Sequence, residues 1–404
     1  MTTRHWLPGL SRVSAAVLML AVAVAYIERT TISHALPFII DEAHLTKSES
    51  GLILSGFGFG YVLSLPFSGW IIQKLGHAAT LRWLSIGWLV SAIGFSFADN
   101  YASMFLARLV LGVFEGPLFP LFVSWLSLST KSESRPVAIG FIESCSYVGM
   151  AFAGPITVGI AQSSNWRMAY ACVGAMALVV SLASFRLQEP RKFEGQPDDP
   201  LAPPKAKRNR QVLVSSALIA MGFLLYNTAK SFYSTWFPTI LVKGFGQTSA
   251  DAAMVTLIQS LAAPLASLAV AAASVSLLRT GVSVSIARCV PLGLGLSLGA
   301  TIYAALQFPQ SVSIFSTIAF VGLISTSALI WNAIPDTVEP IHVGLAAGWV
   351  NALANVGTII SPIVVGRLFQ KSLEVTLSVV ALICLLAIPF FILSYSAGRS
   401  VPDR

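Results

Sequence analysis

Long apolar runs alternate with short polar stretches along the whole chain, and this pattern gives the first expectation about its structure. Each run is long enough to cross the hydrocarbon core of a bilayer as a helix, which takes about 20 residues. We therefore predict an all-α membrane protein with twelve transmembrane helices. The runs span 12–40, 49–75, 80–98, 103–129, 136–162, 165–187, 212–242, 250–277, 283–307, 312–335, 341–369 and 372–397.

Only one long polar stretch interrupts the pattern, at residues 188–211. It is rich in proline and charge, which is typical of a flexible linker. We predict an N-terminal six-helix half at 1–187, a linker at 188–211 and a C-terminal six-helix half at 212–404.

The two halves carry similar features at corresponding places. Pro37 lies near the end of the first run and Pro238 near the end of the seventh. The fifth and eleventh runs each contain Pro-x-x-x-Gly, at Pro155 and at Pro362. Together these matches indicate an internal repeat. Two pseudo-symmetric halves around a midplane site are the architecture expected of an alternating-access carrier.

Composition agrees with the membrane assignment and excludes an ordinary soluble domain. Hydrophobic residues make up 55% of the chain and charged residues 10%, with a mean hydropathy of +0.77. Soluble domains carry about a quarter charged residues. The four cysteines lie in apolar runs without metal-ligand spacing, so we expect no metal site and no disulfide framework. No cleavable signal is expected, because the first apolar run is too long for one.

The net charge of +8 is explained by the topology of the loops and does not indicate a nucleic-acid partner. If the N-terminus is cytoplasmic, the inner loops and tails hold 17 of the 25 basic residues, the outer loops hold five, and the remaining three, Arg29, Arg108 and Lys230, lie within the membrane. Because cytoplasmic loops carry an excess of Lys and Arg, both termini are placed inside, and with them the linker.

Charged residues placed inside the membrane, away from the ends of the runs, are the candidates for function, because a charge there is costly unless it faces a partner or a polar cavity. Three acids and three bases form this set, which is neutral as a group and so avoids unpaired charge in a low dielectric. Its members are Glu28, Arg29, Arg108, Glu115, Glu143 and Lys230.

Arg29 precedes Pro37 by eight residues, and Lys230 precedes Pro238 by eight. Under the repeat, the two cations occupy equivalent places on the first and seventh helices. We hypothesise that they hold an anionic substrate from two sides, the guanidinium binding a carboxylate through two hydrogen bonds. The alternative is that each cation only pairs with one of the three acids.

The fourth run contains Arg108-x-x-x-Gly112-x-x-Glu115-Gly116, which places Arg108, Gly112 and Glu115 on one helical face. The glycines permit close approach of another helix. Burial and a nearby cation act on a carboxyl in opposite directions, so Glu115 can exchange protons in a usable range. The alternative is a static salt bridge. Glu28 is the second candidate proton carrier.

Other polar residues are weaker candidates. Glu143 is expected at the rim of a cavity. Tyr61, Gln259, Asn351 and Asn355 lie in apolar runs, where they can hydrogen-bond either a substrate or a neighbouring helix.

These residues resemble the major facilitator superfamily, and within it the anion:cation symporter group that includes sugar-acid carriers and vesicular glutamate transporters. The resemblance covers nearly the whole chain. Its specific motifs are Tyr26-x-Glu28-Arg29, Ala35-Leu36-Pro37, Gly60-Tyr61, the Arg108–Gly116 motif, Asn165-Trp166-Arg167, Trp236-Phe237-Pro238, Asn351-x-x-x-Asn355 and Ser361-Pro362.

The resemblance implies the major facilitator fold and a role for several residues. Arg29 matches the arginine that contacts the substrate carboxylate, and Glu115 the acid tied to proton coupling. Arg108 matches its charged companion, and Tyr61 a cavity tyrosine. The group usually has Asp where this chain has Glu28, which changes the reach of that acid.

The loop after the second helix departs further from the superfamily pattern Gly-x-x-x-Asp-Arg-x-Gly-Arg. This chain has Gly69-x-x-x-Gln73-Lys74-x-Gly76-His77, without the acid that normally locks the inner gate. The inner gate is then closed less firmly, or other residues stabilise its closed state.

The expected function is import of a small organic anion, sugar-acid-like, coupled to protons. An efflux carrier on the same fold and a substrate-sensing receptor that has lost transport stay open as alternatives. No catalytic motif indicates an enzyme. We expect no cofactor besides the coupling proton, and a monomer in a bacterial inner membrane.

Overall fold

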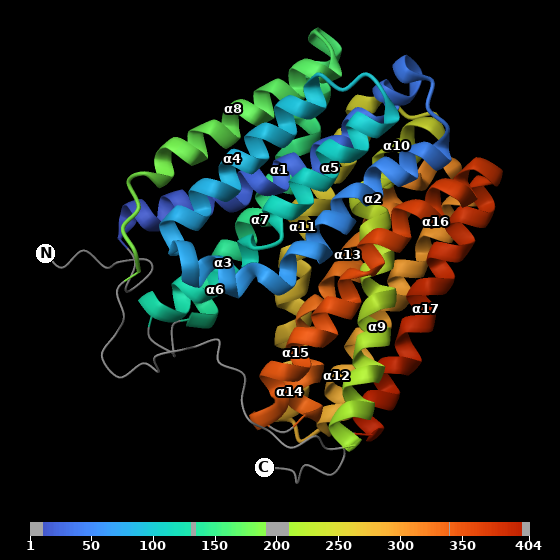
Figure 1. The fold of residues 1–404 in the computed structure, drawn as a ribbon. Coiled ribbons are helices and arrows are strands. Elements are labelled where there is room, and N and C mark those ends of the chain that lie inside the picture. The colour runs from blue at the N-terminus through green and yellow to red at the C-terminus, as the bar shows by residue number, and fades with distance from the viewer. Residues whose placement is uncertain (1–10, 131–134, 191–209, 339, 398–404) are drawn as a thin grey trace, which may run out of the picture. The chain divides into compact units, whose positions relative to one another are not determined.

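A computed structural model describes residues 11–130, 135–190, 210–338 and 340–397 (Figure 1). Every regular element in these ranges is a helix. In the N-terminal half the elements are α1 Arg12–Ala43, α2 Lys47–Ser64, η1 Leu65–Phe67, α3 Ser68–Leu75, α4 His77–Ser96, α5 Tyr101–Glu115, α6 Leu118–Ser129, α7 Arg135–Ser163 and α8 Trp166–Ser184. In the C-terminal half they are α9 Arg210–Thr235, α10 Phe237–Lys243, α11 Ser249–Arg279, α12 Val284–Gly299, η2 Ala300–Leu306, η3 Pro309–Ser311, α13 Val312–Ser325, α14 Ser327–Thr337, α15 Pro340–Asn355, α16 Gly357–Lys371 and α17 Leu373–Ala397.

These elements form twelve spans that are long and apolar enough to cross a membrane, which confirms the predicted all-α fold class. Most predicted bounds agree with the observed ones within a few residues. The spans are Arg12–Ala43, Lys47–Leu75, His77–Ser96, Tyr101–Ser129, Ala138–Ser163, Trp166–Ser184, Val212–Thr235, Ser249–Arg279, Val284–Leu306, Pro309–Thr337, Ala346–Lys371 and Leu373–Ala397.

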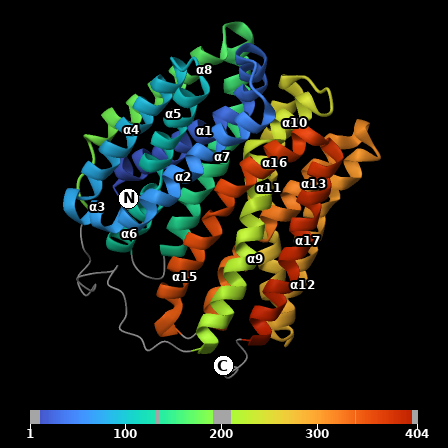
Figure 2. The same cartoon turned by 45° about the vertical axis from the view of Figure 1, so that its right-hand side comes forward.

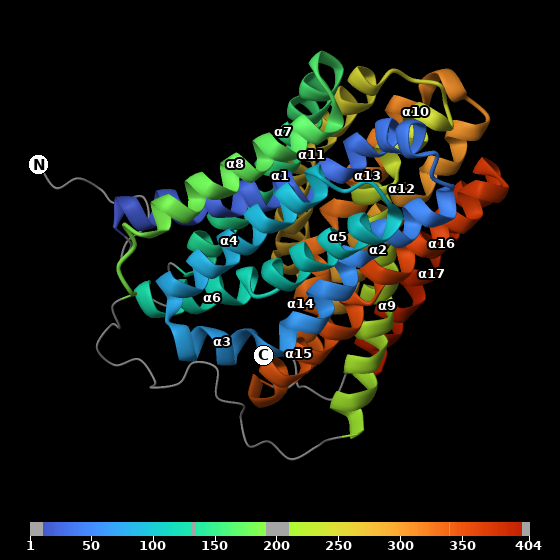
Figure 3. The ribbon, with the colours of Figure 1, turned by 45° about the horizontal axis from the view of Figure 1, so that its top comes forward.

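By packing, the described chain divides into two units, 11–45 with 52–190 and 46–51 with 210–397. Most of the predicted linker, residues 191–209, lies outside the described residues. In the N-terminal unit, α1 packs along α7 and α8, and α4 packs along α5 and α8 (Figure 3). Large buried side chains, among them Trp88 and Trp125, fill the core of this unit.

In the C-terminal unit, α9 packs against α15, α16 and α17, and Figure 2 shows α9 and α17 side by side. The long helix α11 packs along α13. Gln259 of α11 donates a hydrogen bond from Nε2 to Ser316 Oγ of α13 at 3.2 Å. The Gln259 side chain was expected to hydrogen-bond either a substrate or a neighbouring helix, and in the structure it bonds a neighbouring helix.

Three runs that the sequence predicts as continuous are interrupted at prolines, and the second of the twelve is interrupted at Pro66, within η1. The fourth run stops at Glu115 and resumes at Leu118 after Gly116 and Pro117, and the seventh stops at Thr235 and resumes as α10. Proline lacks the N–H that a helix interior requires, but it suits the first turn of a new helix. The break after Glu115 leaves this acid at the end of α5.

The expected close approach of a helix to the glycines of the fourth run is confirmed. A Cβ at Gly112 would overlap the backbone carbonyl of Phe57 on α2, and a Cβ at Gly60 would overlap that of Leu109 on α5. The backbones of α2 and α5 therefore meet directly, as small residues allow in membrane helices. This contact fixes the height of Arg108 and Glu115 relative to α2.

Candidate functional site

Glu28 and Arg29, the neighbouring charged residues of α1, lie in different surroundings. Successive residues of a helix project about 100° apart, so Glu28 and Arg29 cannot share a face. The Glu28 side chain is fully buried. The Arg29 side chain stays 24% exposed and lines a pocket in the N-terminal unit. Only the cation of this pair is therefore presented to a ligand.

Arg29 forms an ion pair across the pocket wall with Glu115. Its Nη2 lies 2.6 Å from Oε1 of Glu115, whose side chain is 1% exposed. The break between α5 and α6 leaves Glu115 as the last residue of its helix, directed at α1. A buried carboxylate and a pocket-facing guanidinium are thereby held in one short contact.

Three aromatic rings surround the guanidinium of Arg29. Its Cζ lies 4.7 Å from the ring centroid of Tyr26, 4.5 Å from that of Phe57 and 5.2 Å from that of Tyr61. Ring faces attract a cation at these distances, most strongly where water is excluded. The rings hold the charge in place, and Nε has no protein partner among the described residues.

Arg108 forms a second, fully internal layer with Glu28. Its side chain is 1% exposed, its Cζ lies 5.2 Å from the ring centroid of Phe57, and its Nη2 donates to the Arg29 carbonyl at 3.4 Å. Ser91 of α4 lies beside the Glu28 carboxyl, and Nε and Nη1 of Arg108 have no hydrogen-bond partner among the described residues. Glu28 and Arg108 interact electrostatically, so each of these opposite charges offsets part of the cost of burying the other.

The pocket that Arg29 faces is lined by α1, α2, α5, α6 and α7. The apolar part of the lining comes mostly from α6. The polar part consists of Tyr26, Arg29, Tyr61, Glu115, Glu143 and Ser146. The structure thus brings together four predicted candidates, Arg29, Tyr61, Glu115 and Glu143, while Glu28 and Arg108 lie behind them.

The remaining predicted candidates belong to the C-terminal unit. Lys230 is half-buried on α9. Asn355 donates from Nδ2 to the Oδ1 of Asn351 at 2.9 Å and to its backbone carbonyl at 2.8 Å, so the two amides bond each other along α15. That these side chains share one cavity with Arg29 stays a prediction.

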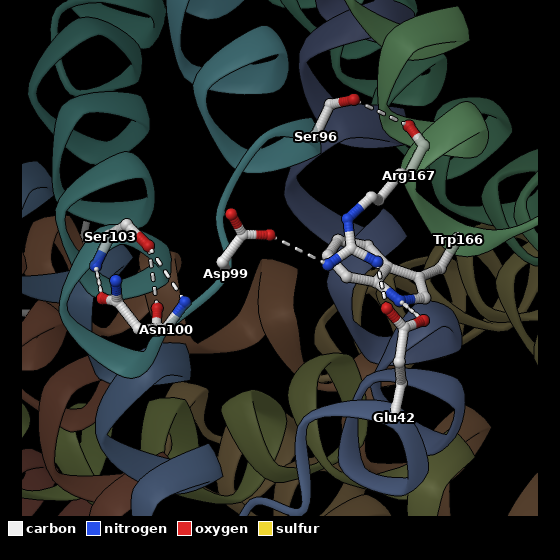
Figure 4. Close-up of polar contacts among 7 residues, drawn as sticks. All are labelled: Glu42, Ser96, Asp99, Asn100, Ser103, Trp166 and Arg167. Carbon is white, nitrogen blue, oxygen red and sulfur yellow. Dashed lines mark hydrogen bonds and ion pairs between the residues drawn. The ribbon is translucent and has the colours of Figure 1, made fainter.

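A polar cluster at one end of the N-terminal unit was not predicted, although two of its residues belong to the motif Asn165-Trp166-Arg167 of the family resemblance. Figure 4 shows Glu42 of α1 accepting hydrogen bonds from Trp166 and Arg167 of α8. The Trp166 Nε1–Oε2 distance is 2.7 Å, and Arg167 Nη2 lies 3.3 Å from Asp99 Oδ1 in the α4–α5 loop. Asn165 caps α8 by accepting from the N–H of Met168. The motif therefore joins α1, α8 and this loop.

A second unpredicted contact lies at the loop that lacks its usual acid. Glu189, which follows α8, accepts from the backbone N–H groups of His77 and Ala78, each at 2.9 Å. The His77 ring lies against Trp125 and its Nε2 is 2.9 Å from Ser124 Oγ. Glu189, which follows the sixth span, thus caps the first turn of the third span.

The third unpredicted cluster is an ion pair in the C-terminal unit. Arg288 Nε of α12 lies 2.9 Å from Asp336 Oδ2 of α14, and Tyr395 of α17 donates to the same oxygen at 3.0 Å. Both charged side chains are mostly buried, at 13% and 19% exposed. Because both residues lie near the ends of predicted runs, the sequence suggested that they belong to loops. The signal available in the sequence was that Arg288 and Asp336, which have opposite charges, each lie near the end of a predicted run.

Comparison with known proteins concerns the chain as a whole. Residues 18–362 match the model of the Major Facilitator Superfamily. The chain is 28% identical to a D-galactonate transporter of Escherichia coli O6:H1, covering 90% of each protein. It is 27% identical to a probable sulfoacetate transporter of Cupriavidus necator, with 92% of this chain and 88% of the relative covered. It is 26% identical to a probable galactarate/D-glucarate transporter of Escherichia coli K12, with 88% and 87% covered.

Solved structures show the same fold at low identity. A bacterial homologue of the human lysosomal transporter Spinster has a TM-score of 0.79 at 15% identity, with 96% of this chain and 98% of that chain covered. A D-xylose–proton symporter has a TM-score of 0.73 at 14% identity, with 94% and 96% covered. The family and these relatives are transporters, which confirms that the chain is not an enzyme. The chain belongs to the Major Facilitator Superfamily.

Proposed function

We propose that the protein imports a small organic anion, a carboxylate of the sugar-acid kind, together with one or more protons. The relatives named above carry names of organic-acid transporters, for D-galactonate, for galactarate or D-glucarate, and for sulfoacetate. Secondary transport by alternating access between two halves is the mechanism that the repeat and the family favour. In this proposal both termini are cytoplasmic and the protein acts as a monomer in a bacterial inner membrane.

One observation carries the proposal: the partly exposed guanidinium of Arg29 in a pocket otherwise lined by aromatic, apolar and acidic side chains. A guanidinium offers paired donors that match a carboxylate, and this one is fixed by three rings. Arg29 is the only cation that lines the described pocket. An anion entering this part of the molecule therefore has one point of attachment.

Glu115 gives a reason for coupling to protons. While it is ionised, Glu115 engages Arg29 and repels a second carboxylate. Protonation removes that charge, so Arg29 can exchange Glu115 for the substrate carboxylate. Substrate binding and protonation then favour each other, as thermodynamic linkage requires. Glu28, buried beside this layer with Arg108, is the alternative proton carrier.

Lys230, Tyr61, Asn351 and Asn355 complete the proposed binding set. Tyr61 lines the pocket beside Arg29. Lys230 would supply the second positive charge, and the asparagine pair would hydrogen-bond hydroxyl groups of a sugar acid. These contributions depend on the two halves sharing one cavity during the transport cycle.

The deciding experiment is counterflow in proteoliposomes that contain the purified protein and unlabelled D-galactonate. Labelled D-galactonate added outside should accumulate transiently in vesicles with the unaltered protein. Arg29→Ala should abolish this exchange, and Arg29→Lys should retain a small part of it, because the charge stays while the paired donors are lost.

Each alternative has its own outcome. A sensing receptor binds the acid, seen as a thermal shift, but shows no exchange. An exporter exchanges label but is not driven to accumulate it by an inward proton gradient. Full exchange by Arg29→Ala would exclude Arg29 as the attachment point of the carboxylate.

A further inference from the structure

Glu143 of α7 lines the same pocket as Arg29 and Glu115. Its side chain is exposed, whereas that of Glu115 is 1% exposed and engaged by Arg29. None of the ion pairs found among the described residues includes Glu143. The pocket wall therefore carries a second carboxylate that is open to a ligand and has no described counter-charge.

The charges of the lining limit which anions this wall accepts. Its charged members are one cation, Arg29, and two acids, Glu115 and Glu143. When Glu115 is protonated, one cation and one carboxylate are left. On this wall, one anionic group of a substrate is then matched by Arg29, while a second anionic group reaching α7 would meet Glu143. Lys230, the second proposed cation, belongs to the other unit and is not part of this wall. Like charges brought together at short range disfavour the wrong ligand.

The hydrogen-bonding groups on α7 also disfavour a second anionic group of the substrate. The Ser146 hydroxyl, one turn further along α7, already donates to the Glu143 backbone carbonyl at 2.6 Å. Neither Ser146 nor Glu143 then offers a hydrogen to an anion on this side of the pocket. A carboxylate accepts strongly from hydroxyl groups.

We infer that Glu143 is a specificity-determining residue that favours hydroxylated monocarboxylates over dicarboxylates of the same length. This inference rests on the proposed function, because it presumes that Arg29 binds the substrate carboxylate. It also goes beyond that function, since the relatives' names include acids with one carboxylate and acids with two.

The test compares two acids that differ only at C6: D-galactonate, which ends in a hydroxymethyl group, and galactarate, which ends in a second carboxylate. Gluconate and glucarate form a second such pair. Dissociation constants for the purified protein, measured by isothermal titration calorimetry, give the preference for one carboxylate over two. The unaltered protein should prefer the monocarboxylate about tenfold or more, and Glu143→Gln should reduce this preference about tenfold.

Two control variants separate this effect from a general change of charge. Glu143→Asp keeps the carboxylate and should keep most of the preference. Glu374→Gln makes the same chemical change at an exposed acid in the first turn of α17, and should leave the preference unaltered. Size-exclusion profiles report whether each variant is folded, which an exposed position favours.

The outcomes distinguish this inference from the proposed function. If D-galactonate or gluconate binds and Glu143→Gln leaves the preference unchanged, the role of Glu143 is excluded while the transport proposal stands. Equal affinity of the unaltered protein for both members of each pair would also overturn it. If no acid binds to the unaltered protein, the proposed substrate class fails and the inference falls with it.

Discussion

Arg29 Nη2 and Glu115 Oε1 lie 2.6 Å apart, so the group proposed to bind the substrate and the group proposed to carry the proton are partners of each other. In the proposed mechanism, a carboxylate substrate and Glu115 compete for one guanidinium. In this arrangement coupling does not require a signal to travel between distant sites. It follows from the exchange of one ionic partner for another.

Replacement of Glu115 by Gln should separate exchange from accumulation. The amide mimics the protonated acid, so Arg29 stays available and counterflow of D-galactonate should persist. Accumulation driven by an inward proton gradient should fall to the level without a gradient, because the group that carries the proton is absent. Both are measured in the same proteoliposomes.

Glu28→Gln is the matched variant for this test, because Glu28 is the other buried acid of the site. If Glu115→Gln accumulates substrate normally and Glu28→Gln does not, the proton is carried by Glu28. Normal accumulation by both variants would contradict proton coupling through this pair of acids.

Gly112→Ala should destabilise the N-terminal unit. The added methyl group would overlap the Phe57 carbonyl where α2 and α5 meet, and forced overlap of this kind costs about 1–3 kcal/mol. Thermal unfolding in detergent measures the change. Gly94→Ala is the control, because a Cβ at Gly94 on α4 has no neighbour within 4 Å. An equal melting temperature for Gly112→Ala and the unaltered protein would mean that α2 and α5 can separate freely.

The helices and the residues at the centre of the candidate site could be picked out because both leave a signal in consecutive residues. A membrane span needs a continuous apolar run, so the pattern alone gave twelve spans at nearly the observed bounds. Arg29 and Glu115 stood out as charges within such runs. Gly112 stood out by its spacing from Arg108.

The unpredicted clusters depend on partners that are far apart in the chain. Glu42 meets Trp166 from more than a hundred residues away, and Glu189 reaches back to His77 over a similar distance. Nothing in the local pattern around Glu42 or Glu189 indicates a partner. Such pairings follow from how the helices pack, which periodicity does not specify.

Trp166 and Glu42 should be coupled energetically. The indole N–H donates to a carboxylate, and a hydrogen bond to a charged group contributes about 1.5–3 kcal/mol. A double-mutant cycle of Trp166→Phe and Glu42→Ala, read out by unfolding, should therefore show a coupling free energy of about 1 kcal/mol or more. Arg167→Gln should have a smaller effect that fades at high salt, because that pair is partly exposed. A coupling near zero would mean that Glu42 is not held by the indole.

Glu189→Ala should loosen the first turn of α4. The carboxylate satisfies two backbone N–H groups at that helix start, and loss of such a cap costs about 1 kcal/mol. Amide hydrogen exchange at residues 77–80 should become faster, while exchange at the start of α8, capped by Asn165, should not change. Glu189→Gln keeps one acceptor and should lie between the two. Unchanged exchange in Glu189→Ala would mean that another group caps α4.

Arg288 and Asp336 should behave as a mostly buried ion pair: removing one partner should lower the free energy of unfolding more than replacing both. Asp336→Ala leaves the Arg288 guanidinium without its carboxylate and removes the acceptor of Tyr395, so we expect a loss of about 3–5 kcal/mol in the free energy of unfolding. The double variant Arg288→Met with Asp336→Leu restores apolar packing and should recover most of this loss, because neither charge is then buried alone. Unfolding in denaturant measures all three proteins. Arg288 Nη1 also donates to Ser274 Oγ at 3.0 Å. If the double variant is as unstable as Asp336→Ala, this hydrogen bond and the one from Tyr395 to Asp336, and not the ion pair itself, stabilise this end of the unit.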